Sequence, residues 1–464
     1  MRSTPRFSLL TLSLPFAIAC GSEGGGSDPA PAPDASPDAP YEASVDASPD
    51  ALTEASPDAL PDASPDVTPD ASPDASPDAS PDASPDAPPD ALPDATPDAD
   101  AEADAQVPSV ALFLASNYAT AAEMIAVDLH QDAVLGTLVS DDQDSLVDAR
   151  DGHGFLLRRT AGEVQVLNPA QPWLVEHTVD VAPEAGTANP WAVVVPAGNK
   201  AYVVRYGQNS LSIIDPVAGT LLGELDISAY VTDSDGLVDA FAGVFDPSTG
   251  RAYIGLQRVN QLDFGSPPDY VHTCNDSHPA IVAIDTSDDS IVDLNGADPG
   301  EALEVASYNP WRMLWDEASG RIILLSVGCA VTDDGGTSTR ARRGVEAVNP
   351  SAGTSEWLWT TDGLDRPGDL IWVSGTEAVV GLDDASFLRT WRAWDPSTSQ
   401  LGATLTGVPD IPVWDGARGL VGLAFGSTSL DVVRYDLDDG TSSTLVENAF
   451  TTTGVFATSS ARLH

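Results

Sequence analysis

A run of side chains that can bind a metal ion lies in the middle of the chain, at His272-Thr-Cys274-Asn-Asp-Ser-His278. Two imidazoles and a thiolate at this spacing can hold a soft or borderline metal ion. The alternative is a disulfide, because Cys274 and Cys329 are the two thiols that remain once Cys20 is set aside, and an oxidising compartment favours their pairing. We predict the disulfide and no cofactor, and keep the metal site as the alternative.

A basic cluster, Arg340-Ala-Arg342-Arg343, interrupts an otherwise acidic chain. Guanidinium groups bind carboxylate, sulfate or phosphate through paired hydrogen bonds, so the cluster could bind an anionic ligand. The alternative is that these arginines pair with Asp333, Asp334 and neighbouring carboxylates on a crowded acidic surface. Both interpretations leave these arginines at the surface.

Two tryptophans, Trp191 and Trp311, each follow an Asn-Pro pair. Rings at one position of a repeat either stack a sugar or another ring of a ligand, or wedge between structural units. Tyr270, which lies close to the His-Cys-His run, has the same two interpretations.

Signatures of catalysis are absent from the sequence. It contains no Gly-x-Ser-x-Gly, no His-Glu-x-x-His and no phosphate-binding loop. Four pairs of adjacent carboxylates are interpreted as solvated turn residues: Asp141-Asp142, Asp288-Asp289, Asp383-Asp384 and Asp438-Asp439. The sequence therefore favours a binding protein over an enzyme.

The charge balance excludes one class of partner. The 464 residues carry a formal net charge of −51, whereas a nucleic-acid-binding protein needs a basic surface. We expect no nucleic-acid partner.

The first 20 residues have the pattern of a cleaved export signal: Arg2 and Arg6, then the apolar run Phe7–Ile18, then Cys20. This end resembles the bacterial lipobox, whose cysteine becomes the acylated first residue of a lipoprotein. Gly21 follows the cysteine, and in the lipoproteins that the pattern resembles this implies the outer membrane, on its periplasmic or outer side. The alternative is an ordinary secretory signal cleaved before Cys20.

Residues 21–106 are dominated by the tetrapeptide Ser-Pro-Asp-Ala and contain no lysine or arginine up to residue 105. Regular proline removes backbone donors, and regular aspartate adds repulsion, so this segment cannot bury a core. We predict a disordered, extended linker that sets the distance between the membrane and the domain that follows.

Residues 107–464 contain short alternating apolar runs typical of strands. An Asp or Asn recurs where such a run ends, at Asp128, Asn168, Asp215, Asp285, Asn349, Asp395 and Asp436. Four of the six spacings lie between 40 and 47 residues, and the other two are 64 and 70. This period is typical of four-stranded propeller blades. We predict an all-β, seven-bladed β-propeller, with six or eight blades as alternatives.

The clearest repeat unit is Pro196-Ala-Gly-Asn-Lys200, then Tyr202-Val-Val, then Ile213-Ile-Asp215. It resembles the YVTN-type propeller repeat. Relatives of this type include lactone-hydrolysing enzymes, so the resemblance implies a propeller hydrolase as an alternative function. A structural envelope protein without a small ligand is a third possibility.

The ends of the domain predict how the ring closes. Blade one begins directly with a strand of the second type, Val110–Ala115, and lacks an inner strand. An apolar stretch left over at the end, Thr453–Thr458, would supply that strand and remove the exposed sheet edges.

Both long spacings contain an insertion between the second and third strands of a blade, Gln257–Pro279 and Ser326–Gly344. Loops of this kind lie on one face of a propeller, and loops on a rigid scaffold often carry binding residues. Nine of the domain's basic residues are expected on this face, among them Arg158, Arg205 and the Arg340–Arg343 cluster. We predict a membrane-anchored envelope lipoprotein whose propeller binds a protein or an anionic ligand there.

Overall fold

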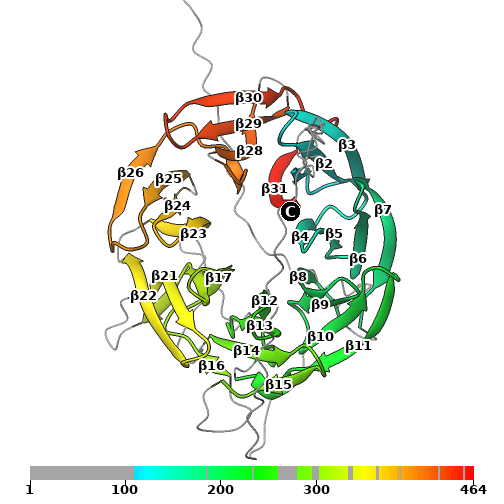
Figure 1. Ribbon diagram of the computed structural model, residues 1–464, viewed down its shortest axis with the longest axis vertical. Helices are drawn as coiled ribbons and strands as arrows, with labels where there is room; N and C mark the ends of the chain where they lie inside the picture. Colours follow the sequence, from blue (N-terminus) through cyan, green and yellow to red (C-terminus); the bar gives the residue numbers. More distant parts are fainter. Residues whose placement is uncertain are drawn as a thin grey trace, which may run out of the picture. The chain divides into compact units, whose positions relative to one another are not determined.

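The computed structural model describes residues 109–463 with eleven gaps, and its described part is built of strands arranged in a ring (Figure 1). The gaps are residues 184–185, 233–234, 260–278, 295–301, 333–337, 362–364, 385, 387, 418, 427–428 and 453–454. The described residues contain one helical element, the 3-10 turn Ser228–Tyr230. No helix among them is long and apolar enough to cross a membrane.

Seven antiparallel sheets of four main strands form a seven-bladed β-propeller, as the repeat predicted. Each blade is given from its innermost strand outward. Blade one is β31 (Phe456–Leu463), β1 (Val110–Ser116), β2 (Ala122–Asp128) and β3 (Ala133–Ser140). Blade two is β4 (Ser145–Arg150), β5 (His153–Arg158), β6 (Glu163–Asn168) and β7 (Gln171–Asp180). Blade three is β8 (Pro190–Ala197), β9 (Lys200–Arg205), β10 (Ser210–Asp215) and β11 (Thr220–Asp226).

The remaining blades follow the same order. Blade four is β12 (Ala240–Asp246), β13 (Arg251–Leu256), β14 (Ala280–Asp285) and β15 (Ser290–Val292), and β16 (Leu303–Glu304) also pairs with β14. Blade five is β17 (Pro310–Asp316), β18 (Arg321–Ser326), β21 (Arg343–Asn349) and β22 (Thr354–Thr361). Blade six is β23 (Arg366–Ser374), β24 (Glu377–Asp383), β25 (Arg389–Trp394) and β26 (Leu401–Leu405). Blade seven is β27 (Asp410–Trp414), β28 (Gly419–Phe425), β29 (Leu430–Asp436) and β30 (Ser442–Val446).

The C-terminal strand closes the ring, as predicted. β31 pairs with β1 from Val110↔Leu463 to Ser116↔Phe456, with one register shift between Leu114 and Ala115, and supplies the inner strand of blade one. The strand begins later than the predicted Thr453, because the backbone at Thr451 and Thr452 is held by hydrogen bonds to Glu123 rather than by a sheet.

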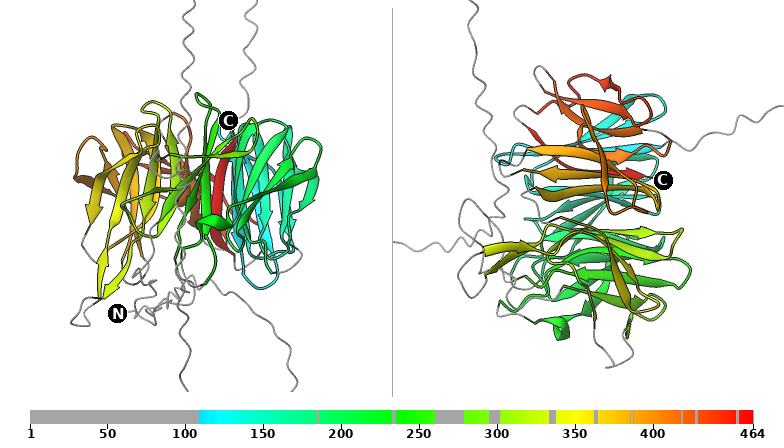
Figure 2. Two further views of the ribbon diagram at one scale, coloured as in Figure 1. Left: turned by 90° about the horizontal axis from the view of Figure 1, so that it is seen from below. Right: turned by 90° about the vertical axis from the view of Figure 1, so that its left-hand side faces the viewer.

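The two faces of the ring differ in their loops. We call the end that carries the second-to-third-strand loops the insertion face, and the other end the opposite face. Both predicted insertions lie on the insertion face, since they connect β13 to β14 and β18 to β21. The second insertion contains a hairpin, β19 (Cys329–Thr332) and β20 (Ser338–Ala341), beyond the body of blade five (Figure 2).

The recurring Asp or Asn closes the turn after the third strand of every blade, on the opposite face. In six blades its side-chain oxygen accepts a hydrogen bond from the backbone N–H two residues on, as Asp215 does from Val217 at 2.9 Å. Asn349 instead accepts from Ala352, three residues on, at 3.0 Å. The marker residue therefore forms an Asx turn that leads into the outer strand.

The core is divided among the seams between blades. The described residues form seven apolar clusters, and each joins two neighbouring blades. Tyr202 of blade three and Ile254 of blade four, for example, are both fully buried in one cluster. Second strands therefore read as continuous apolar runs, whereas the outer strand β11 is mostly exposed. The seam between blades six and seven has the smallest cluster, with four buried residues.

Candidate functional site

Three neighbouring blades place an aromatic ring at the same point on the insertion face. In β8, β12 and β17 the ladder to the second strand skips one residue, and the skipped residues are Trp191, Phe241 and Trp311. A β-bulge of this kind bends the strand and redirects the extra side chain. The inner strands follow left-handed residues with φ between 46° and 50°: Asn189, Asp239 and Asn309.

The two tryptophans meet across the intervening blade. The ring centroids of Trp191 and Trp311 are 5.7 Å apart in an edge-to-face arrangement, and Tyr206 lies 5.2 Å from Trp191. Both tryptophans are half-buried. The Tyr206 hydroxyl donates to Gln257 at 2.8 Å, and Gln257 donates to the Pro310 carbonyl at 2.7 Å. The rings thus pack on the protein and also remain partly accessible at the channel mouth.

An ion pair between Arg159 and Asp144 extends the contacts of Trp191 towards blade one. The Arg159 guanidinium lies 4.1 Å from the centre of the Trp191 ring and forms an ion pair of 2.7 Å with Asp144. Partial loss of surrounding water raises the pKa of the nearby Tyr118 hydroxyl to about 12, although 44 % of the residue stays exposed, and the negative charge of Asp144 adds to this rise. Arg159 opposes the rise, because a nearby positive charge stabilises the phenolate.

Blades five and six contribute a second charged group. Arg312 of β17 forms an ion pair of 3.1 Å with Asp369 of β23, whose side chain is only 3 % exposed. Arg389, the first residue of β25, donates to Asp383 at 2.7 and 3.1 Å and lies 3.5 Å from Asp369. Arg366 reaches the same Asp383 at 3.5 Å. Two buried carboxylates thus fix three guanidinium groups at this side of the mouth.

A glycine makes room for these ion pairs. In β23 the ladder skips Gly368, which occupies the bulge position of Trp191 and Trp311 in blades three and five. A Cβ atom on Gly368 would collide with the Asp383 carboxylate and the Arg389 guanidinium. At blade six, the contacts between neighbouring blades on this face change from packing of aromatic rings to ion pairs.

We call the connected set the mouth ring, and its members lie on the insertion face. The mouth ring consists of Tyr118, Asp144, Arg159, Trp191, Trp311, Arg312, Asp369 and Arg389. Its carboxylates are held by arginines, so its accessible groups are ring faces and guanidinium edges. Such groups suit stacking and the recognition of anionic groups better than proton transfer.

The structure shows different environments for the arginines predicted for this face. Arg158 pairs with Asp141 and Glu163. Arg205 is fully buried and donates to the Val181 carbonyl at 2.9 Å while pairing with Glu224. Its selection as a surface binding residue is corrected, since a ligand has no access to it.

The residues of the two insertions are described only in part. Arg342 is exposed and lies 4.6 Å from the centre of the Tyr308 ring, whereas Arg343 is buried and reaches the Asp365 carbonyl at 3.4 Å. Arg340 lies on β20, and nothing is described of its side chain. Residues outside the described part are Cys20, Tyr270, His272, Cys274 and His278. Cys329 is buried and bonded rather than a free thiol, and its pairing with Cys274 stays a prediction.

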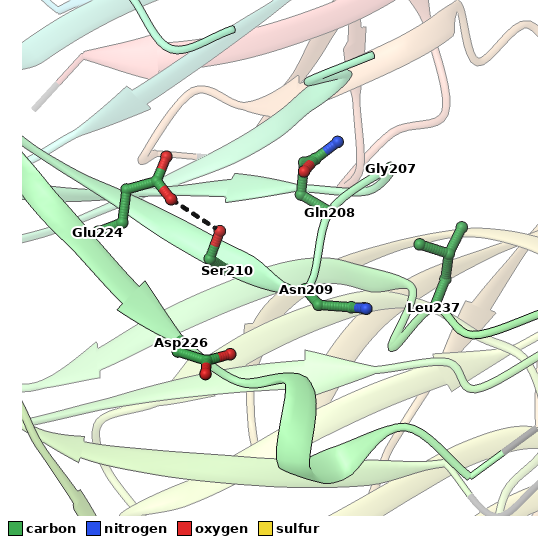
Figure 3. A pocket seen from close by; sticks show the side chains of 7 residues that line it. All are labelled: Gly207, Gln208, Asn209, Ser210, Glu224, Asp226 and Leu237. Carbon is green, nitrogen blue, oxygen red and sulfur yellow. Dashed lines mark hydrogen bonds between the residues drawn. The ribbon is translucent and has the colours of Figure 1, made fainter. Parts of the chain in front are cut away.

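An open groove of about 460 Å³ lies beside the β9–β10 loop of blade three, and none of the residues that line it belongs to the mouth ring (Figure 3). Polar groups of Asn209, Ser210, Glu224 and Asp226 line it. Ser210 donates to Glu224 at 3.1 Å, as the dashed line in Figure 3 marks, so these groups already bond to one another.

Sequence reasoning placed Arg159, Arg312 and Arg366 among the nine basic residues of this face, but it missed Arg389 and the carboxylates Asp369 and Asp383. Asp383 was interpreted as a solvated turn residue, but it is buried at the end of β24. Asp142 is buried too and accepts from the backbone of Thr160 and Ala161 at 2.9 Å. The register back from the Asp395 marker could have placed Arg389 at the start of a third strand. Within the described ranges, no three His, Cys, Asp or Glu side chains are grouped to hold a metal ion.

Comparison with known proteins supports no family assignment. No family model matches the chain, and no curated protein sequence matches it. Solved structures resemble it at low identity. They include a "putative 6-phosphogluconolactonase" from Bacteroides fragilis, with 10 % identity, a TM-score of 0.49, and coverage of 77 % of this chain and 98 % of that one.

Two further propellers resemble the chain less closely. One is the Cps50 (Swd1) β-propeller domain of Myceliophteria thermophila, with 9 % identity, a TM-score of 0.44, and coverage of 73 % and 96 %. The other is apo AztD from Citrobacter koseri, with 11 % identity, a TM-score of 0.39, and coverage of 77 % and 98 %. The propeller assignment rests on the strand pairing, and these likenesses carry nothing about function.

Proposed function

We propose that this protein is a binding module of the cell envelope and that its ligand binds at the mouth ring. The observation that carries the proposal is the contact between Trp191 and Trp311, two partly accessible rings on a rigid scaffold, flanked by Arg159 and Arg312. Ligand sites concentrate where a few polar groups converge beside apolar or aromatic walls.

A binding screen on the mature chain tests this proposal. Isothermal titration against neutral and acidic sugars, aromatic acids and inorganic anions should find a class of ligand whose affinity falls at least tenfold in Trp311→Ala. Leu222→Ala, at an exposed position on the outer strand β11, is the matched control and should bind normally. Turnover of a lactone would replace the proposal with hydrolase activity, and no binding at all would favour a structural envelope protein.

We propose further that acylated Cys20 anchors the protein to the outer membrane. The lipobox-like end supports this, because several acyl chains on one cysteine anchor firmly. β1 runs from the opposite face towards the insertion face, so the chain before Ser109 joins the propeller at the opposite face. Mass spectrometry of the N-terminal peptide should show acylation, and Cys20→Ser should release the protein from the membrane fraction.

The third part of the proposal is a disulfide between Cys274 and Cys329 that fastens the two insertions to each other. In the chain-entropy model a bridge closing a loop of about 55 residues stabilises the fold by roughly 4 kcal/mol. Thiol counting on unreduced, denatured protein should find no free thiol besides any contributed by Cys20. Two additional free thiols would contradict the bridge.

A further inference from the structure

We propose that the ligand of the mouth ring is a ring compound with a single carboxylate, and that Arg312 binds this carboxylate. The inference rests on the proposed binding function and adds the chemical class of the ligand. It is carried by the exposure, the fixed orientation and the neighbours of Arg312.

Arg312 keeps more of its surface than the other ion-paired arginines that the structure describes on this face. Its side chain is 45 % exposed, whereas those of Arg159 and Arg205 are 9 % and 0 % exposed. The contact with Asp369 uses Nη2. Because a guanidinium has five donors, one edge can hold Asp369 while another binds a ligand carboxylate.

Asp369 holds this guanidinium in place. Its carboxylate is 3 % exposed, accepts from the Leu370 N–H at 2.9 Å and also contacts Arg389. The buried Asp369 carboxylate would lose one of its two guanidinium partners if Arg312 moved away, which favours the Arg312–Asp369 contact in the free protein. A ligand therefore meets a donor that is already oriented, and it loses less entropy on binding than at a mobile arginine.

The surroundings of Arg312 select the rest of the ligand. Trp311 precedes it in the chain, and the edge-to-face contact of Trp311 with Trp191 leaves both rings partly accessible at the mouth. We infer that a ring stacked there places its substituent near Arg312, because Trp311 is the bulge residue directly before it. Stacking on an aromatic side chain and an ion pair to a guanidinium together define an acidic sugar or an aromatic acid.

Charge disfavours a ligand with several acidic groups. Arg312, Arg366 and Arg389 face Asp369 and Asp383, and the exposed Asp410 lies close to Arg389, so the three positive charges of this group are balanced by three carboxylates. The whole chain carries a net charge of −51. At long range this field repels phosphates and polyanions more strongly than a singly charged carboxylate.

Titration calorimetry on the mature full chain tests the inference with paired probes. Glucuronate is compared with glucose, and benzoate with benzyl alcohol, so that the arms distinguish an acidic sugar from an aromatic acid. We expect one acid to bind at least tenfold more tightly than its neutral partner. Equal affinity within both pairs would overturn the inference.

Variants separate this inference from the proposed function. Arg312→Gln should weaken the binding of the acid at least tenfold and leave the affinity for the neutral partner unchanged. The affinity of Arg312→Lys for the acid should lie between those of the parent protein and Arg312→Gln. Arg321→Gln, which removes an ion pair with Glu356 on the opposite face, is the control and should bind normally. If Trp311→Ala abolishes binding and Arg312→Gln does not alter it, the proposed binding function of the mouth ring is supported, and the proposal that Arg312 binds the carboxylate is wrong. If no probe binds, the two proposals fail together.

Discussion

Glu123 and Thr451 join the two ends of the propeller chain. The buried Glu123 carboxylate accepts from the Thr451 N–H at 3.1 and 3.0 Å and from its hydroxyl at 2.9 Å. The Thr452 N–H adds a fourth contact at 2.6 Å. These bonds fix the segment that enters β31, the strand that closes the ring.

The same device recurs in blade five. Glu346 of the third strand is fully buried and accepts from the backbone N–H groups of Ala306 and Ser307, each at 2.8 Å. Both glutamates therefore hold the chain just before it enters the inner strand of their own blade. Two blades thus use a buried carboxylate to accept hydrogen bonds from backbone N–H groups that are not paired within a sheet.

Replacing Glu123 should loosen the closure. Glu123→Ala leaves two backbone donors and one hydroxyl without their acceptor, and losing charge-assisted bonds at a buried site costs about 2–4 kcal/mol. Urea unfolding of the mature chain should show this loss in the free energy of unfolding. Glu176→Ala, at an exposed position on the outer strand β7, should change it by less than about 0.5 kcal/mol. Equal midpoints for the two variants would contradict the closure role.

The Asx turn after each third strand predicts a graded series at Asp215. Its carboxylate accepts from the N–H groups of Val217 and Ala218, both at 2.9 Å. Asp215→Ala should cost about 1–2 kcal/mol, because two backbone donors lose a partner. Asp215→Asn should be nearly neutral, since Asn168 accepts the same two backbone hydrogen bonds, from Ala170 and Gln171. Thermal unfolding checks both, and an Asn variant as unstable as the Ala variant would argue against the turn.

The sequence predicted the scaffold well because its signals are local. An Asx turn needs one side chain and the next two or three residues, so seven markers along the chain located seven third strands. Alternation and apolar runs located the strands beside them. The start of β31 was misplaced by three residues because Glu123, which holds the preceding segment, is distant in sequence.

The candidate site could be predicted only in part, because its contacts are between blades. Trp191 and Trp311 were found from a repeated tripeptide, and the structure puts their rings in contact. Asp369 and Arg389 have no such local pattern, since each acquires its role from residues on another strand. Arg205 illustrates the reverse error, as its place at the end of a strand did not reveal that it is buried.

Gly368 tests whether the ionic half of the mouth needs a residue without a side chain. Gly368→Ala would place a Cβ atom against Asp383 and Arg389, and overpacking of this kind costs about 1–3 kcal/mol. Gly375→Ala is the control in the same blade, because a Cβ there meets nothing within 4 Å. Chemical unfolding should separate the two variants. If both were as stable as the parent, the bulge would be able to shift without disturbing the ion pairs.

The raised pKa of Tyr118 gives the mouth ring a response to alkaline pH. Loss of water around the phenol, followed by the charge of Asp144, raises this pKa from 10.0 to about 12. The native state therefore keeps the proton to a higher pH than the unfolded chain does. The resulting stability is fully present below pH 10 and is lost as the pH rises from 10 to 12.

Absorbance titration of tyrosinate, with Tyr118→Phe subtracted, should show one group ionising near pH 12. Asp144→Asn should lower this pKa, because it removes a negative charge that disfavours the phenolate. Arg159→Gln should raise the same pKa, because the positive charge that favours the phenolate is lost. A Tyr118 pKa that stays unchanged in both variants would show that the phenol does not interact with the Asp144–Arg159 pair, and the mouth ring would then end at Asp144.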